Sequence, residues 1–232
     1  MSLTRKLINL MSLSCTISAY LIAAPIKNQF FTLMIDPAGD AHYTGRTIDN
    51  NFERGITFQA AELLKQTLEE RNKDLRVVIT RAPDEVIAPL QNASFANRLK
   101  TDLYLNLNFF YTKNSTSSLF IYYLQKNKLT DQWYKPKNNL SFVPYQYAHT
   151  INSELAKKLT DNAYDTLKKE FGHYFITHQP IGFPCAPLVG IQAPALSFEI
   201  GINKKEDWKA VVAPLVTVIE NNMKIIKASS HE

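Results

Sequence analysis

The feature that most constrains this chain is a regular alternation of short apolar runs with longer amphipathic segments. Residues 30–35 (FFTLMI) form a continuous apolar run, which is typical of a strand covered on both faces. Further strands are predicted at residues 75–80, 102–110, 119–124 and 194–201. Strands that alternate with helices indicate a single α/β domain with a largely parallel, twisted sheet and helices on both faces.

The predicted helices lie between these strands. Residues 51–72 place apolar side chains at helical spacing, and residues 149–171 repeat the pattern. Residues 85–100 predict a helix that can break at Pro89, and the last helix is expected at residues 205–227. The stretch 126–146 has no clear period and contains two prolines, so a long surface loop is expected there.

The N-terminus has the three-part pattern of a secretory signal peptide. A basic start (MSLTRK) is followed by an uncharged, largely apolar stretch at residues 7–24 and then by the polar PIKNQ. The apolar stretch is also long enough to cross a bilayer, so an uncleaved anchor is a second interpretation and a buried helix a third. We therefore expect a leader or anchor at residues 1–27, a domain at residues 28–232, and export to the periplasm or cell envelope.

Charge and cysteine content narrow the function classes. The formal charge of +5 comes from scattered lysines and arginines, and no recognised nucleic-acid-binding motif occurs, so a nucleic-acid partner is not expected. Without the leader, Cys185 is the last cysteine left, which excludes an internal disulfide and a cysteine zinc cluster.

Polar residues stand at the ends of three predicted strands. Asp36, Asn108 and Glu199 each follow or interrupt an apolar run. In α/β sheets, sites form where loops leave the carboxyl ends of the strands. These three residues are therefore expected to share one crevice.

A series of motifs then follows in order: IDPAGDAHYTGR, a glutamate (Glu53) on the first helix, VVITRAPDE, FANRLKTDLYLNLNFF, and APALSFEIGINKKED. In this order and at these spacings, residues 30–227 resemble the zinc-dependent N-acetylmuramoyl-L-alanine amidases of bacterial cell-wall turnover. The resemblance implies the amidase/phosphorylase-hydrolase-like fold, and peptidoglycan or muropeptides as ligands.

The resemblance also implies specific roles. In that family, two histidines and a glutamate hold zinc, which activates water to cleave the amide between the lactyl group and L-alanine, while a second glutamate transfers protons. Carried over, Glu53 is the metal-binding glutamate and Glu199 the catalytic base. Gly39 and Asn108 stand at the two histidine positions, and neither glycine nor a neutral amide replaces imidazole as a zinc ligand.

Two interpretations of the metal site stay open. His42 lies three residues after Gly39, so a rearranged loop could bring it toward Glu53, with His178 as a further ligand. Alternatively, His42 is an ordinary loop residue, and Arg46 or Arg54 pairs with either Glu53 or Glu199.

Ligand binding is predicted at Asn108, Arg46 and Phe110. Phe110 is included because saccharides often lie against exposed aromatic rings, although aromatic residues also fill cores. The sequence thus predicts an amidase-like protein acting at peptidoglycan with impaired or altered metal catalysis. The alternative is an inactive pseudoenzyme that binds cell-wall fragments or regulates other hydrolases.

Overall fold

A computed structural model describes residues 30–88, 90–113, 116–125 and 145–229. The predicted leader at residues 1–27, most of the predicted loop at residues 126–146, and His231 lie outside these ranges. The compact unit of the chain is Phe31–Glu232. In the part of the chain that is described, no helix is long and apolar enough to cross a membrane.

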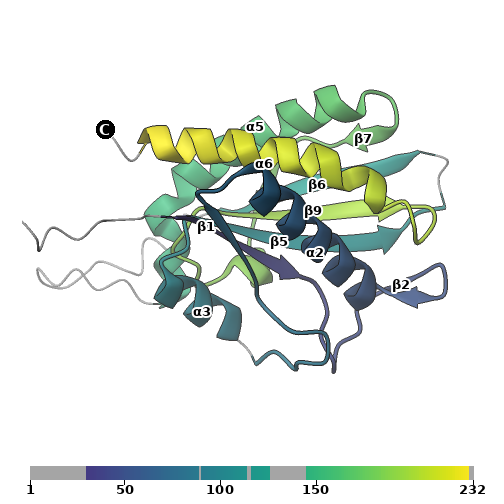
Figure 1. Cartoon of the computed structure of the whole chain (residues 1–232), viewed down its shortest axis with the longest axis horizontal. Coiled ribbons are helices and arrows are strands. Elements are labelled where there is room, and N and C mark those ends of the chain that lie inside the picture. Colours follow the sequence, from purple (N-terminus) through teal and green to yellow (C-terminus); the bar gives the residue numbers. More distant parts are fainter. Residues whose placement is uncertain (1–29, 89, 114–115, 126–144, 230–232) are drawn as a thin grey trace, which may run out of the picture. The chain divides into compact units, whose positions relative to one another are not determined.

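The centre of the domain is a seven-stranded mixed sheet (Figure 1). Four parallel strands are followed by β6, which runs antiparallel to β9 and carries the short strands β7 and β8 on its other edge. In spatial order the strands are β4 (Leu75–Ile79), β1 (Phe31–Pro37), β5 (Leu103–Tyr111), β9 (Ala195–Ile202), β6 (Ser117–Leu124) and β7 (Phe175–Thr177), with β8 (Ile181–Phe183) also on β6.

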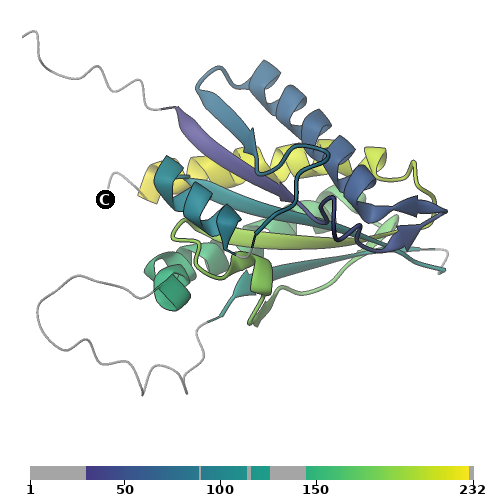
Figure 2. The ribbon, with the colours of Figure 1, turned by 90° about the horizontal axis from the view of Figure 1, so that it is seen from below.

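Helices cover both faces of the sheet, as the sequence predicts (Figures 1 and 2). One face packs against α2 (Glu53–Arg71), α5 (Ser153–Phe171) and α6 (Lys209–Ser229), and it forms the larger core. The other face packs against α3 (Gln91–Leu99) and the segment around the 3-10 helix η2 (Ala186–Leu188).

The alternation of side chains along the strands explains this division. Leu33 and Ile35 point into the larger core, whereas Met34 lies in the smaller one with Tyr104 of β5. Successive residues of a strand point to opposite faces, so both faces of β1 are apolar because both are covered. This accounts for the continuous apolar run at its position in the sequence.

Residues 85–100 contain a helix only in their second half, which agrees with the possible break at Pro89. α3 begins only at Gln91, after Leu90 in the left-handed conformation (φ 65°). A residue before proline is disfavoured in helices, and Ala88 precedes Pro89. Residues 85–88 instead bind the β1–α2 loop: Ala41 N–H donates to Glu85 O, and Ile87 N–H donates to Asp40 Oδ2.

Other element ends differ by a few residues. The helix expected from residue 149 is a 3-10 helix, η1 (Tyr145–Asn152), before α5, and α6 starts at Lys209 rather than at residue 205. A two-stranded ribbon, β2 (Thr47–Ile48) with β3 (Asn51–Phe52), was not expected from the sequence. This ribbon leads directly into α2 and fixes the loop that contains Arg46.

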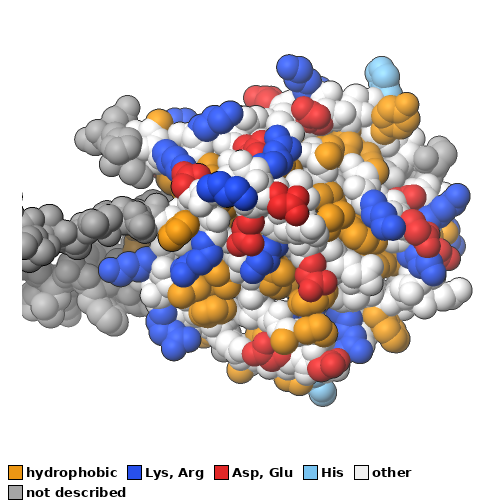
Figure 3. All heavy atoms as spheres, in the orientation of Figure 1, with side chains coloured by type: hydrophobic (Ala, Val, Ile, Leu, Met, Phe, Trp, Pro, Cys, Tyr) orange, Lys and Arg blue, Asp and Glu red, His pale blue; other side chains and the backbone are white. Residues whose placement is uncertain are grey.

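Charged side chains are interspersed on the face of the molecule drawn in Figure 3. Lysine and arginine alternate with aspartate and glutamate over the visible described residues, and no large area of a single sign is seen there. This distribution agrees with the scattered charges in the sequence.

Candidate functional site

The register of the sheet brings the predicted polar residues to one edge. Asp36 lies beside Asn106, and Asn108 lies beside Glu199. Asn106 and Asn108 are two residues apart on β5, so their side chains leave the same face of the sheet. The polar groups therefore lie in adjacent strands. They are on the face of the sheet that α3 covers nearer the start of these strands, at Met34 and Tyr104.

Asp36 is the centre of a buried hydrogen-bond network. Its Oδ1 accepts from Thr80 Oγ1 (2.9 Å) and from Asn92 Nδ2 (2.8 Å), and its Oδ2 accepts from Asn106 Nδ2 (3.0 Å). Burial raises the pKa of Asp36, and the hydrogen bonds from Tyr104, Thr80 and Asn106, with the charge of Arg81, act in the opposite direction. The network joins β1, the residue that follows β4, α3 and β5.

Asn108 continues this network. Its Nδ2 donates to Asn106 Oδ1 (2.7 Å), to Phe198 O (3.1 Å) and, at 3.3 Å, to Ser197 Oγ. Ser197 Oγ in turn donates to Asn106 Oδ1 (2.8 Å). At one of the two positions where the family has histidine, the side chain is thus part of a polar network between β5 and β9.

Glu53 lies at the start of α2 and is 4% exposed. Its Oε1 accepts the backbone N–H of Phe109 (2.9 Å), and its Oε2 accepts the backbone N–H of Arg46 (3.0 Å). The backbone N–H of Glu53 donates in return to Arg46 O (2.8 Å). Both carboxylate oxygens therefore stabilise the backbone around them.

Glu199 forms an ion pair with Arg46. The Nη2 atom of Arg46 lies 2.5 Å from Glu199 Oε1, and Tyr122 Oη donates to Glu199 Oε2 (2.9 Å). The two charged side chains are 49% and 23% exposed. Burial and the neighbouring carboxylate of Glu199 raise the pKa of Tyr122, so its hydroxyl stays protonated and donates.

The loop at Gly39 is tightly packed. Gly39 has φ 79°, and a Cβ atom there would lie 2.8 Å from Arg54 Cβ and 3.0 Å from Tyr43 O. Asp40 closes the turn: its N–H donates to Tyr43 O, and its Oδ1 accepts the N–H groups of His42 and Tyr43. The turn leaves no room for any side chain at position 39, including the histidine of the family.

The two alternative ligands point elsewhere. The side chain of His42 is exposed and lies edge-on to Tyr43, with ring centroids 4.6 Å apart. His178, after β7, stacks on Phe120 at 4.1 Å. A metal role for either histidine stays a prediction, and the contacts described for them are those of a loop residue and of a stacked ring.

The residues present do not fit the zinc that the resemblance implies. Glu53 is bound to two backbone N–H groups, Asn108 donates to three acceptors, and Gly39 excludes a side chain. Within the described ranges, no group of three or more His, Cys, Asp or Glu side chains is placed to hold a metal ion. The polar groups at this edge bind one another instead.

A pocket of about 790 Å³ opens beside this network. Asp36, Asn106 and Asn108 line its polar part, and Val86, Leu90 and Val189 belong to its apolar part. Asn92 also lines it, and its buried Oδ1 accepts no hydrogen bond from any described residue. The pocket thus combines a large apolar surface with a few polar groups.

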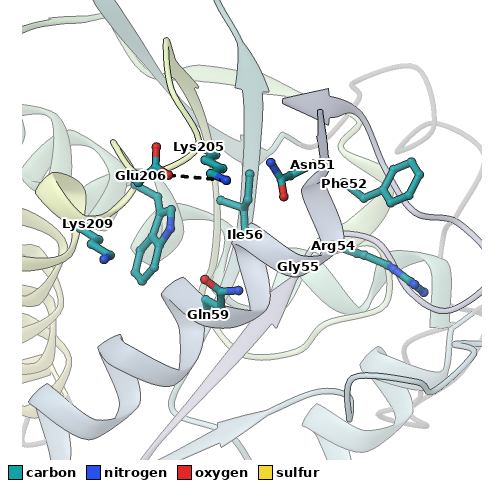
Figure 4. Close-up of a pocket in the computed structure, with 10 residues that line it drawn as sticks. Asn51, Phe52, Arg54, Gly55, Ile56, Gln59, Lys205, Glu206 and Lys209 are labelled. Atoms are coloured by element: carbon teal, nitrogen blue, oxygen red, sulfur yellow. Dashed lines mark ion pairs between the residues drawn. The ribbon is translucent and has the colours of Figure 1, made fainter. Parts of the chain in front are cut away.

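A smaller pocket of about 420 Å³ lies between the start of α2 and the loop before α6 (Figure 4). It contains the Lys205–Glu206 ion pair (3.7 Å), while Phe52 and Arg54 point away from the hollow. Asp36, Asn108 and Glu199 are not among its lining residues. It therefore lies apart from the edge where the family motifs meet.

Cys185 is buried, and burial raises the pKa of its thiol to about 11. The thiol is therefore protonated near neutral pH, which makes it a weak nucleophile.

Sequence reasoning missed three residues of this site: Asn106, Ser197 and Asn92. A signal existed for Asn106, because two asparagines at a spacing of two in LNLN place two amides on one face of a strand. The other two residues come from α3 and β9, and their convergence depends on the packing of the sheet.

Comparisons with known proteins agree with the fold described above. A family model described as N-acetylmuramoyl-L-alanine amidase matches residues 33–217. No curated protein sequence matches the chain.

Solved structures of the same fold include an N-acetylmuramoyl-L-alanine amidase from Clostridium difficile 630 (17% identity, 84% of this chain and 97% of that chain, TM-score 0.57). The catalytic domain of CwlV from Bacillus (Paenibacillus) polymyxa var. colistinus is also similar (16% identity, 83% and 98%, TM-score 0.59). A third is the CwlD amidase from Clostridioides difficile in complex with the GerS lipoprotein (12% identity, 85% and 98%, TM-score 0.58). At these identities the structures establish the fold.

Proposed function

Because the chain belongs to the N-acetylmuramoyl-L-alanine amidase family, we propose that it binds peptidoglycan or muropeptides at the carboxyl edge of its sheet without zinc-dependent hydrolysis. The family membership supports the ligand class. The proposal that hydrolysis is lost depends on the state of the two carboxylates.

One observation carries this proposal: Arg46 binds both carboxylates that the family reaction needs. Its backbone N–H donates to Glu53 Oε2, and its guanidinium pairs with Glu199 Oε1. A metal ligand must direct its lone pairs at the ion, and a general base must reach the attacking water. Glu53 would have to leave two backbone donors, and Glu199 would have to leave its ion pair, before either could act in this way.

Binding requires none of these changes. The 790 Å³ pocket falls within the size range of small-molecule sites and combines apolar walls with a few polar groups. The predicted leader at residues 1–27 fits a protein that acts in the cell envelope.

The rival function is an amidase with altered catalysis, and a specific observation supports it. The Arg46–Glu199 pair is partly exposed, and exposed ion pairs contribute only about 0–1 kcal/mol. A substrate could therefore separate the pair at low cost and release Glu199.

The test uses the full-length chain with purified peptidoglycan and soluble muropeptides, with and without zinc or a chelator. We expect co-sedimentation with peptidoglycan that the chelator does not change, and no release of stem peptides. Ala88 is exposed and lines the pocket, so Ala88→Trp should fill the pocket and reduce muropeptide binding. Ala82 is exposed but does not line it, so Ala82→Trp is the matched control.

Two outcomes would reject the proposal. Zinc-dependent release of stem peptides that Glu199→Gln abolishes would establish the amidase instead. Failure to bind either peptidoglycan or muropeptides would leave the pocket without its proposed ligand.

A further inference from the structure

Four aromatic side chains form a row across the sheet on the same face as Glu199. We call Phe110, Phe120, Tyr122 and Phe183 the aromatic row. The ring centroids of Phe110 and Phe120 are 6.3 Å apart, those of Phe120 and Tyr122 are 6.3 Å apart, and those of Tyr122 and Phe183 are 5.0 Å apart. The rings come from β5, β6 and β8, so the row crosses β9, the strand that carries Glu199, and ends on β8 at the edge of the sheet.

The row is not part of either core. Phe109 and Phe198, which point to the other face, are fully buried in the larger core. By contrast, Phe110, Phe120 and Tyr122 are each partly exposed, and Phe183 is 39% exposed. The rings of the row therefore keep some surface that is open to a ligand, although His178 stacks on the ring of Phe120.

Gly201 fixes the position of the first ring. A Cβ atom at Gly201 would lie 2.7 Å from Phe110 Cζ and 2.9 Å from Ser118 Oγ. Gly201 is the neighbour of Phe110 in the β5–β9 register. The ring of Phe110 thus lies against β9 in space that only glycine leaves free, and this close approach supports the ring as an oriented surface.

Hydrogen-bonding groups lie beside the rings. The guanidinium carbon of Arg46 is 5.7 Å from the ring centroid of Phe110, and Tyr122 itself donates to Glu199. A pyranose ring can contact both features. Its polarised C–H groups suit the negative face of an aromatic ring, and its hydroxyl or acetamido groups can form hydrogen bonds with the Arg46–Glu199 pair.

We propose that the aromatic row is a glycan subsite that binds an N-acetylated amino-sugar ring, with Arg46 and Glu199 hydrogen-bonding its polar edge. This rests on the proposed function and specifies where the glycan part of the ligand binds. Across the sheet, Asn108, Glu199 and Phe120 are successive neighbours. None of the four rings lines the pocket beside Asn108, which leaves that pocket for the peptide part.

The test measures binding of a peptide-free tetramer of N-acetylglucosamine to the full-length protein by calorimetry, beside a soluble muropeptide. Phe110→Leu and Phe183→Leu should each weaken tetramer binding about two- to tenfold, as expected when one ring contact is lost. Tyr111→Leu is the matched control, because Tyr111 is the next residue, is 46% exposed and points to the opposite face. Thermal melts verify that each variant is folded.

Gly201→Ala supplies a change that does not remove a ring. The added methyl group must displace the Phe110 ring, so the affinity for the tetramer should fall while the four aromatic residues are intact. If Phe110→Leu and Phe183→Leu bind the tetramer as tightly as the native protein does, the subsite is wrong.

A second result separates this inference from the proposed function. If muropeptides bind and the tetramer does not, the glycan subsite is rejected and the proposed function stands. If neither binds and peptidoglycan is not retained, both are rejected.

Discussion

The guanidinium of Arg46 lies 2.5 Å from the carboxylate of Glu199, although 153 residues separate them in the chain. The backbone of Arg46 is fixed at the same time by reciprocal hydrogen bonds with Glu53. One residue thus connects the start of α2 to β9. In this chain the guanidinium of Arg46 neutralises Glu199, the carboxylate to which the family resemblance assigns the role of catalytic base.

The ion pair predicts a measurable but small coupling. In a double-mutant cycle with Arg46→Met and Glu199→Gln, we expect a coupling free energy of about 0.2–1 kcal/mol, because both side chains are partly exposed. Salt at about 1 M should reduce it, since screening acts within about 3 Å at that ionic strength. Urea denaturation of the four proteins at two salt concentrations measures this, and a coupling of zero at low salt would contradict the pairing.

Glu53 is expected to stabilise the fold. Glu53→Gln replaces one acceptor oxygen by an amide donor that faces a backbone N–H, so the free energy of unfolding should fall by roughly 1–3 kcal/mol. Glu62→Gln on the exposed side of the same helix is the control and should change it little. The loss should be the same with and without a chelator. A chelator-dependent loss would instead indicate a metal ligand.

The turn at Gly39 is expected to reject even a methyl group. Gly39→Ala combines a positive φ with a contact of 2.8 Å to Arg54 Cβ, and strain of this kind costs roughly 1–3 kcal/mol. Gly55→Ala in α2 meets nothing within 4 Å and should stabilise the protein by up to about 1 kcal/mol. Thermal and urea denaturation compare the two, and equal effects would show that the turn is not tight.

Restoring the family histidines should not restore a zinc site. In Gly39→His/Asn108→His, the side chain at position 39 has no space in the native turn, and Glu53 remains bound to Phe109 and Arg46. We expect less than stoichiometric zinc by elemental analysis and no protection against unfolding by added zinc. Stoichiometric zinc in a folded double variant would show that the loop rearranges readily.

The buried Asp36 predicts a specific pH dependence of stability. Its pKa is raised above the usual 3.8, so the folded state favours the protonated form. The resulting stabilisation is fully present below pH 3.8 and is lost as the pH rises through the folded-state pKa. Relative to Asp36→Asn, the native protein should therefore lose free energy of unfolding as the pH rises.

Asp74 provides a control of opposite sign. Its hydrogen bond with Lys227 lowers its pKa below 3.8, so its contribution is present above pH 3.8 and is lost as the pH falls. Urea denaturation of Asp36→Asn and Asp74→Asn across acidic pH compares the two slopes. Equal slopes in the two variants would contradict the burial of Asp36.

Much of the fold could be predicted from the sequence because it depends on local periodicity. The strand at β1 and the helix at α2 were predicted within two residues, since a buried strand and an amphipathic helix have different apolar spacings. The start of α3 was predicted only as a possible break at Pro89, and the conformation of residues 85–88 could not be predicted. It depends on Asp40, from another loop, which holds Ile87 outside a helix.

In the candidate site, too, some features could be predicted from the sequence and others depend on tertiary contacts. The sequence alone determined that Asp36, Asn108 and Glu199 end up at one edge, because the carboxyl ends of parallel strands meet there. It also determined that histidine is absent from positions 39 and 108.

Only the tertiary structure decided what these residues do. It gave Gly39 a backbone without space for a side chain, bound Glu53 to the N–H groups of Phe109 and Arg46, and paired Arg46 with Glu199. Hydrogen bonds and ion pairs act over a few ångströms between groups that are distant in the chain. Residue spacing therefore identifies which side chains can meet, whereas the packed loops and strands determine which of them bind one another.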